Sequence, residues 1–63
     1  MDQRINCYVC DDDQLGFDTY AATEWLVFER RGGRVCVDKN GEVPLGSAEC
    51  RKIVAWLNRV ADG

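Results

Sequence analysis

Four cysteines are the residues of this 63-residue chain whose type and spacing could do chemistry. Cys7 and Cys10 form a C-x-x-C pair, and together with Cys36 and Cys50 they could supply the four thiolates of a structural zinc site. The second pair is too widely spaced for a zinc ribbon, and three-residue spacing within a strand directs side chains to opposite faces. We therefore expect small buried apolar cysteines and no cofactor. The alternative is a four-cysteine zinc adaptor, and disulfide or redox chemistry is a third interpretation.

Enzymatic chemistry has little support in the composition. The chain contains no histidine, which excludes Ser-His, Cys-His and His-metal sites within one copy. The Gly32-Gly33 pair is too short a motif for a phosphate-binding loop. Asp11-Asp12-Asp13 begins like a calcium loop, but Leu15 stands where the next carboxylate ligand should be. We therefore predict a protein that is not an enzyme.

Charge is divided by position along the chain. Up to Glu29 there are seven acids and one base, whereas from Arg30 onward there are seven bases and four acids, so the parts carry about −6 and +3 within a net charge of −3. Such asymmetry indicates a charged partner. The acids could face a basic groove on a larger protein, because complementary fields speed encounter and fix orientation.

The prediction for function is a small acidic inhibitor or adaptor that occludes a nucleic-acid-handling protein, its carboxylates standing in for phosphates. By analogy, small acidic chains without catalytic residues occur among phage and mobile-element inhibitors of host defence, of the anti-CRISPR kind. The alternative to a binding surface is an acidic face that is only solvated and keeps the domain soluble. The candidate contact residues are five acids and two aromatics: Asp11, Asp12, Asp13, Asp18, Glu24, Tyr20 and Trp56. Tyr8 is a further aromatic candidate, because an exposed aromatic side chain can anchor an interface.

The basic part of the chain suggests a different kind of partner. Arg30, Arg31 and Arg34 could bind nucleic acid directly, but the acidic total and the lack of an RRM-type motif argue against it. A homodimer is possible, because a thin core and edge strands could be completed by a second copy. The chain shows no signal peptide or membrane-spanning run, so we expect a cytoplasmic protein that does not contact membranes.

Hydrophobic periodicity predicts the elements that must position these residues. We expect strands at 4–10, 24–30 and 34–38, and a further short strand at Glu42-Val43 after an Asn40-Gly41 turn. Residues 11–18 are expected to form an exposed acidic loop, and 18–23 could be helix or strand. A C-terminal helix capped by Ser47 should bury one apolar stripe, with Trp56 at its margin. The core-facing stripe is predicted to contain Cys50, Ile53, Val54, Leu57, Val60 and Ala61.

The predicted fold class is α+β: a small antiparallel β-sheet of three to four strands with one C-terminal α-helix packed on one face. Residues 1–63 should form a single compact domain, because a chain of this length supports only one thin core.

Overall fold

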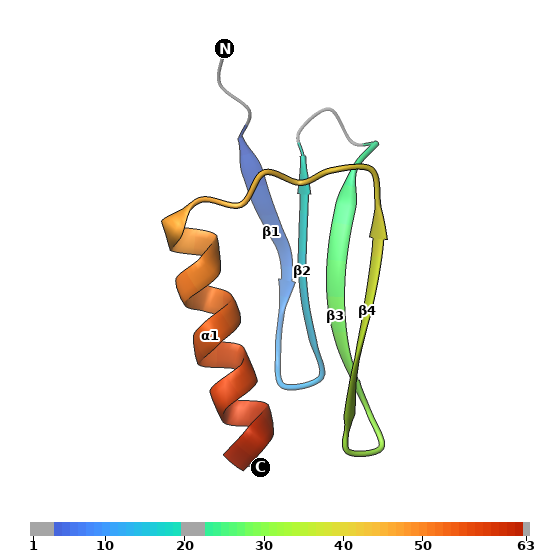
Figure 1. Cartoon of the computed structure of the whole chain (residues 1–63), viewed down its shortest axis with the longest axis vertical. Coiled ribbons are helices and arrows are strands. Elements are labelled where there is room, and N and C mark those ends of the chain that lie inside the picture. The colour runs from blue at the N-terminus through green and yellow to red at the C-terminus, as the bar shows by residue number, and fades with distance from the viewer. Residues whose placement is uncertain (1–3, 20–22, 63) are drawn as a thin grey trace.

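A computed structural model describes residues 4–19 and 23–62. Four antiparallel strands follow one another in the sheet order β1-β2-β3-β4, and one helix ends the chain (Figure 1). The elements are β1 (Ile5–Cys10), β2 (Gln14–Thr19), β3 (Trp25–Arg31), β4 (Arg34–Asn40) and α1 (Ser47–Asp62). The predicted α+β class with a C-terminal helix is therefore confirmed.

Strand β2 was not predicted from the sequence, which indicated an acidic loop over residues 11–18. The loop is confined to the three aspartates, and β2 begins at Gln14. Leu15, Phe17 and Thr19 are buried at alternate positions along β2, and Gly16 between them is buried as well. The period-two pattern of a strand is present here, but glycine and acidic residues occupy the alternate positions and make the segment look like a loop. Asp18, the first residue of the undecided 18–23 segment, belongs to β2, whereas residues 20–22 lie outside the described part.

The segment between β4 and α1 also differs from expectation. Gly41 has φ 72°, as a turn requires, but Glu42 and Val43 form no strand. The chain instead passes across the strands, near the end of the sheet at which β4 stops, and reaches the helix on the β1 side (Figure 1). Val43 and Leu45 pack against the core during this crossing, on either side of Pro44. Proline lacks the N–H that a continued ladder would need.

The N-cap residue of helix α1 lies one position before Ser47, the predicted cap. The Gly46 carbonyl accepts the first helical hydrogen bond, from the Cys50 N–H at 3.0 Å, so Gly46 and not Ser47 is the N-cap residue. The Glu49 carboxylate accepts the Gly46 N–H at 2.7 Å. This contact is the backward half of a capping box, and it places a negative charge at the positive end of the helix.

The core is centred on Trp56, Leu15 and Phe17, whose side chains have no exposed surface. Ile53 and Val60 of the helix pack against this cluster, whereas Val54 is 58% exposed and Leu57 38% exposed. The predicted core stripe was therefore partly wrong. Trp56 lies at its centre, and the neighbouring stripe of the helix, Cys50, Val54, Leu57 and Ala61, faces solvent.

The register assigns side chains to two faces of the sheet. Leu15 lies opposite Phe28, and Phe17 opposite Leu26, so these four side chains point toward the core beneath α1. The alternate residues point to the other side, which α1 does not cover. None of the described helices has the length and apolarity needed to cross a membrane.

Candidate functional site: the open face of the sheet

A shallow hollow lies on the sheet face opposite the core, and we call its lining the open face: Tyr8, Asp18, Trp25, Val27 and Asp38. These residues come from all four strands. Asp18 pairs with Trp25 across β2 and β3, and Val27 pairs with Asp38 across β3 and β4. Directly paired residues share one face of a sheet. Two aromatic rings and a valine are therefore flanked by two carboxylates on one side of the molecule.

A β-bulge in β1 positions Tyr8. The register with β2 shifts between Cys7 and Val9, so Tyr8 lies in the bulged part of the strand. Its ring lies over Gly16, where an added Cβ would be 2.6 Å from the Tyr8 Cζ atom. Bulges re-aim side chains, and here the glycine leaves room for the ring. Tyr8 is still 46% exposed and can contact another molecule.

The electrostatics of the open face are those of an acidic site. Burial raises the pKa of the Tyr8 phenol, and the nearby carboxylates of Asp18 and Asp38 raise this pKa further. Among the described residues, neither of these aspartates takes part in an ion pair. The open face therefore presents two carboxylates whose charge is available to a cationic partner.

The charge reverses toward the β3–β4 turn on the same side of the sheet. Glu29 pairs with Arg31 and accepts a hydrogen bond from the Gln14 amide at 2.7 Å. The Gln14 hydrogen bond, followed by the Arg31 contact, lowers the pKa of the Glu29 carboxyl. Arg31 and Arg34 then close the hairpin. One end of this surface is consequently acidic and the other is basic.

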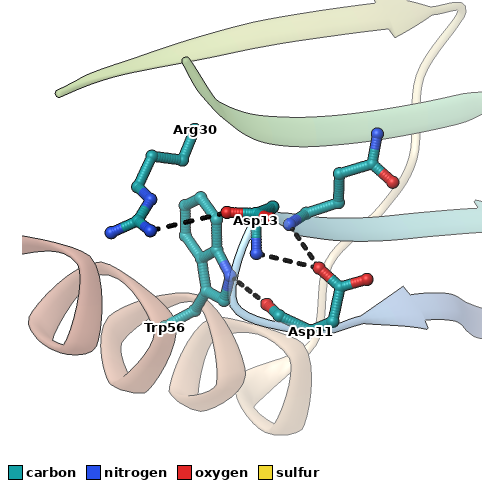
Figure 2. Close-up of polar contacts among 5 residues, drawn as sticks. Asp11, Asp13, Arg30 and Trp56 are labelled. Carbon is teal, nitrogen blue, oxygen red and sulfur yellow. Dashed lines mark hydrogen bonds and ion pairs between the residues drawn. The ribbon is translucent and has the colours of Figure 1, made fainter. Parts of the chain in front are cut away.

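The three consecutive aspartates of the sequence form the β1–β2 turn, away from the open face. The Asp11 carboxylate accepts the N–H groups of Asp13 and Gln14, both at 2.8 Å, and Asp13 forms an ion pair with Arg30 at 3.5 Å (Figure 2). Asp11, Asp12 and Asp13 are all exposed. Two of these acids thus hold the turn and the hairpin, while the Asp12 side chain has no such contact among the described residues.

Trp56 was predicted as a contact residue, and this prediction was wrong because the side chain is fully buried. Its indole N–H donates to the Asp11 carbonyl at 2.7 Å (Figure 2), and its ring lies 6.2 Å from that of Phe28. Trp56 thereby fastens the helix to the β1–β2 turn. Glu24 accepts the Glu42 N–H at 3.4 Å, next to Gly41 and away from the hollow. Tyr20 lies outside the described residues.

The four cysteines are not brought together as the alternative zinc interpretation requires. β1 carries Cys7 and Cys10, β4 carries Cys36 and α1 carries Cys50, and β1 and β4 are opposite edges of the sheet, about 14 Å apart. Residues 4–19 and 23–62 bring no three cysteine, aspartate or glutamate side chains together for a metal ion. The preferred interpretation was also wrong for three of the four, since Cys10, Cys36 and Cys50 are exposed and only Cys7 is partly buried.

The bulge also overturns the expectation that Cys7 and Cys10 point to opposite faces. Cys7 pairs with Phe17 and Cys10 with Leu15, so both cysteines lie on the core side. Burial is the main cause of the raised pKa of the Cys7 thiol, although the nearby Lys52 acts in the opposite direction. The thiol is thus held in its neutral, less nucleophilic form.

Comparison of the chain with protein-family models, with curated proteins and with solved structures gave no match. Of the five residues of the open face, Asp18 and Tyr8 were predicted as contact residues from the sequence, whereas Trp25, Val27 and Asp38 were not. The signal in the sequence was the alternation of Trp25 and Val27 with Leu26 and Phe28, since one alternate set had to face away from the core.

Proposed function

We propose that this protein is a non-enzymatic inhibitor or adaptor that binds a basic surface of a larger protein through the open face. The observation that carries the proposal is the juxtaposition of Tyr8 and Trp25 with the carboxylates of Asp18 and Asp38. Tyrosine and tryptophan are enriched among the residues that contribute most to protein interfaces, and arginine is their usual counterpart.

The arrangement suits a cationic partner in two ways. The carboxylates attract arginine and lysine side chains from a distance, which speeds the encounter. The aromatic rings then offer flat faces on which a guanidinium group can lie while its N–H groups reach the aspartates. Arg31 and Arg34 give the β3–β4 hairpin end of this surface a positive charge, which would orient the partner.

The proposed mechanism is occlusion. Surfaces that bind nucleic acid are basic because they neutralise phosphates. A partner of this class would find spaced carboxylates on the open face in place of phosphates, and binding here would exclude its nucleic acid. The proposal thus retains the nucleic-acid-handling partner expected from the charge of the chain, and moves the contact from the aspartate turn to the open face.

Affinity capture from a nuclease-treated lysate of the source cells tests which surface binds. We expect the wild-type protein to retain a basic partner and Asp18→Lys to reduce its affinity about tenfold or more, since a repulsive charge replaces an attractive one. Asp12→Lys is the matched control, because it makes the same change of charge and residue type at the exposed β1–β2 turn. Circular dichroism would confirm that both variants fold.

The capture experiment separates the two acidic surfaces. Loss of the partner with Asp18→Lys and retention with Asp12→Lys supports the open face. The reverse result would assign the contact to the aspartate turn, and equal retention by both variants would exclude acidic recognition at either place.

A further inference from the structure

The edge strand β4 has the features of a strand that accepts a further strand. All seven of its residues are exposed, and it pairs with β3 in a regular register throughout. The opposite edge, β1, is interrupted by the bulge between Cys7 and Val9. Bulges protect edges against pairing, whereas long regular edges invite it. Val35 and Val37 are 37% and 57% exposed on β4, although they lie on the core side of the sheet.

The β3–β4 turn determines which backbone groups of β4 are unpaired. Gly32 and Gly33 have φ 52° and 81°, as in a two-residue type I′ turn, so Arg31 and Arg34 exchange hydrogen bonds across it. Alternate residues of an antiparallel pair then direct their N–H and C=O groups to the neighbour or away from it. By this alternation the backbone groups of Val35, Val37 and Lys39 point outward from β4.

We propose that β4 pairs antiparallel with β4 of a second copy, about a two-fold axis at Cys36, and joins two sheets into one of eight strands. Val35 of each copy then lies opposite Val37 of the other, with backbone hydrogen bonds between them. Arg34 of each copy lies opposite Asp38 of the other, on the open-face side. The seven-residue strand is therefore complementary to itself in both apolar character and charge.

The neighbouring registers lack this complementarity. A shift by one residue would place outward backbone groups opposite inward ones, so no ladder could form. A shift of the axis to Val37 would set Arg34 opposite Asn40 and Val35 opposite Lys39, losing the ion pair and the apolar pair. The antiparallel arrangement also brings the basic hairpin tip of one copy toward the acidic end of the open face of the other. In the dimer Asp38 is paired with Arg34 of the other copy, whereas Asp18, which β3 separates from β4, keeps its charge available in each copy.

Sedimentation equilibrium of the purified chain tests the inference without any other partner, and so independently of the proposed function. We expect twice the monomer mass of 7.1 kDa. Val37→Arg should weaken dimerisation about tenfold or more, because the introduced charges lie close to the axis. The matched control is Val54→Arg on α1, whose exposure of 58% equals that of Val37 within one per cent.

Charge reversal tests the register. Arg34→Asp and Asp38→Arg should each weaken dimerisation, because each creates two like-charged pairs related by the axis. The double variant restores both attractions with their signs exchanged and should recover wild-type affinity. A rescue of this kind is not expected of a contact made elsewhere.

Cross-linking tests the position of the axis. The two Cys36 residues form a non-hydrogen-bonded pair with Cα atoms about 4.5 Å apart, within the range of a disulfide. In a Cys10→Ser/Cys50→Ser background, diamide should take two electrons and two protons from these thiols and give a covalent dimer. Adding Cys36→Ser should abolish it. A chain that stays monomeric to about 1 mM, a dimer broken by Val54→Arg instead of Val37→Arg, or failure of the charge rescue would each overturn the inference.

Discussion

Tyr8 reports directly on the arrangement of the open face, because its phenol senses both aspartates there. In a Tyr20→Phe background it is the remaining tyrosine, and its ionisation can be followed by ultraviolet absorbance. We expect its pKa to lie above the usual value of about 10. Asp18→Asn should lower this pKa, and Asp38→Asn should lower it less, because the Asp18 charge has the larger effect.

The sign of the associated stability change follows from linkage. The fold favours the neutral phenol, so its contribution is fully present below pH about 10 and is lost as the pH rises through the pKa of the folded state. Asp12→Asn serves as the control, since Asp12 lies at the distant turn. An equal shift with Asp12→Asn, or a Tyr8 pKa at its ordinary value, would contradict the described geometry.

Gly16 is predicted to be coupled to Tyr8. Gly16→Ala would set a Cβ atom 2.6 Å from Cζ and 2.8 Å from Oη of Tyr8, so the ring must leave its place. We expect urea unfolding to show a destabilisation of about 1 kcal/mol or more, as for other overpacked sites. In a Tyr8→Ala background the same substitution should be neutral, because the obstructing ring is gone. Equal destabilisation in both backgrounds would show that the backbone, and not the ring, requires glycine.

The burial of single side chains was harder to predict from the sequence than the fold class. Helical spacing places Trp56 at the margin of the apolar stripe. Its large ring is nevertheless buried in the core, where the Asp11 carbonyl accepts a hydrogen bond from the indole N–H. The opposite outcome holds for Cys50, which lies at helical spacing with Val54 and remains exposed. Periodicity identifies apolar stripes, but the shape of the sheet beneath decides which stripe is buried.

At the scale of elements, substitutions at the start of α1 distinguish Gly46 from Ser47 as the N-cap residue. Glu49→Ala removes the acceptor of the Gly46 N–H and a negative charge from the first turn, so we expect a loss of about 1 kcal/mol in urea unfolding. Glu49→Gln should retain part of this stability, because an amide oxygen can still accept the hydrogen bond.

Ser47→Ala is the informative comparison. Ser47 is the first helical residue in this structure and not the cap, so we expect a change within about 0.5 kcal/mol. A larger loss with Ser47→Ala than with Glu49→Ala would restore Ser47 as the cap and contradict the hydrogen bonds described.

The β3–β4 hairpin was predictable from its turn, whereas the Asn40-Gly41 turn is not followed by the expected strand. The glycine pair at 32–33 identified the β3–β4 hairpin, and both of its strands lie within two residues of the expected bounds. β2 was missed because Gly16 and Asp18 are typical of loops, although they simply occupy its open face. The pairing of β2 with β1 and β3, and its packing against Trp56, outweigh these local preferences.

At the scale of the whole molecule, the fold class followed from the sequence but the candidate site did not. The open face takes residues from four strands that are as far apart in sequence as Tyr8 and Asp38. Its assembly depends on the strand order, on the bulge in β1 and on the β2 register, none of which was evident from the local residue pattern. Charge separation along the chain did not become charge separation in space. Asp13 of the acidic part forms an ion pair with Arg30 of the basic part, and Asp38 of the basic part lies on the open face with Asp18.

Occlusion of a nucleic-acid-binding surface through the open face is the central claim, and equilibrium competition tests it most directly. A labelled nucleic acid would be bound to the captured partner and titrated with wild-type protein, Asp18→Lys and Asp12→Lys. We predict that wild type and Asp12→Lys displace the nucleic acid, and that Asp18→Lys needs an approximately tenfold higher concentration. Nucleic acid that stays bound while wild-type protein saturates the partner would contradict occlusion, and equal potency of the two variants would contradict the open face as its site.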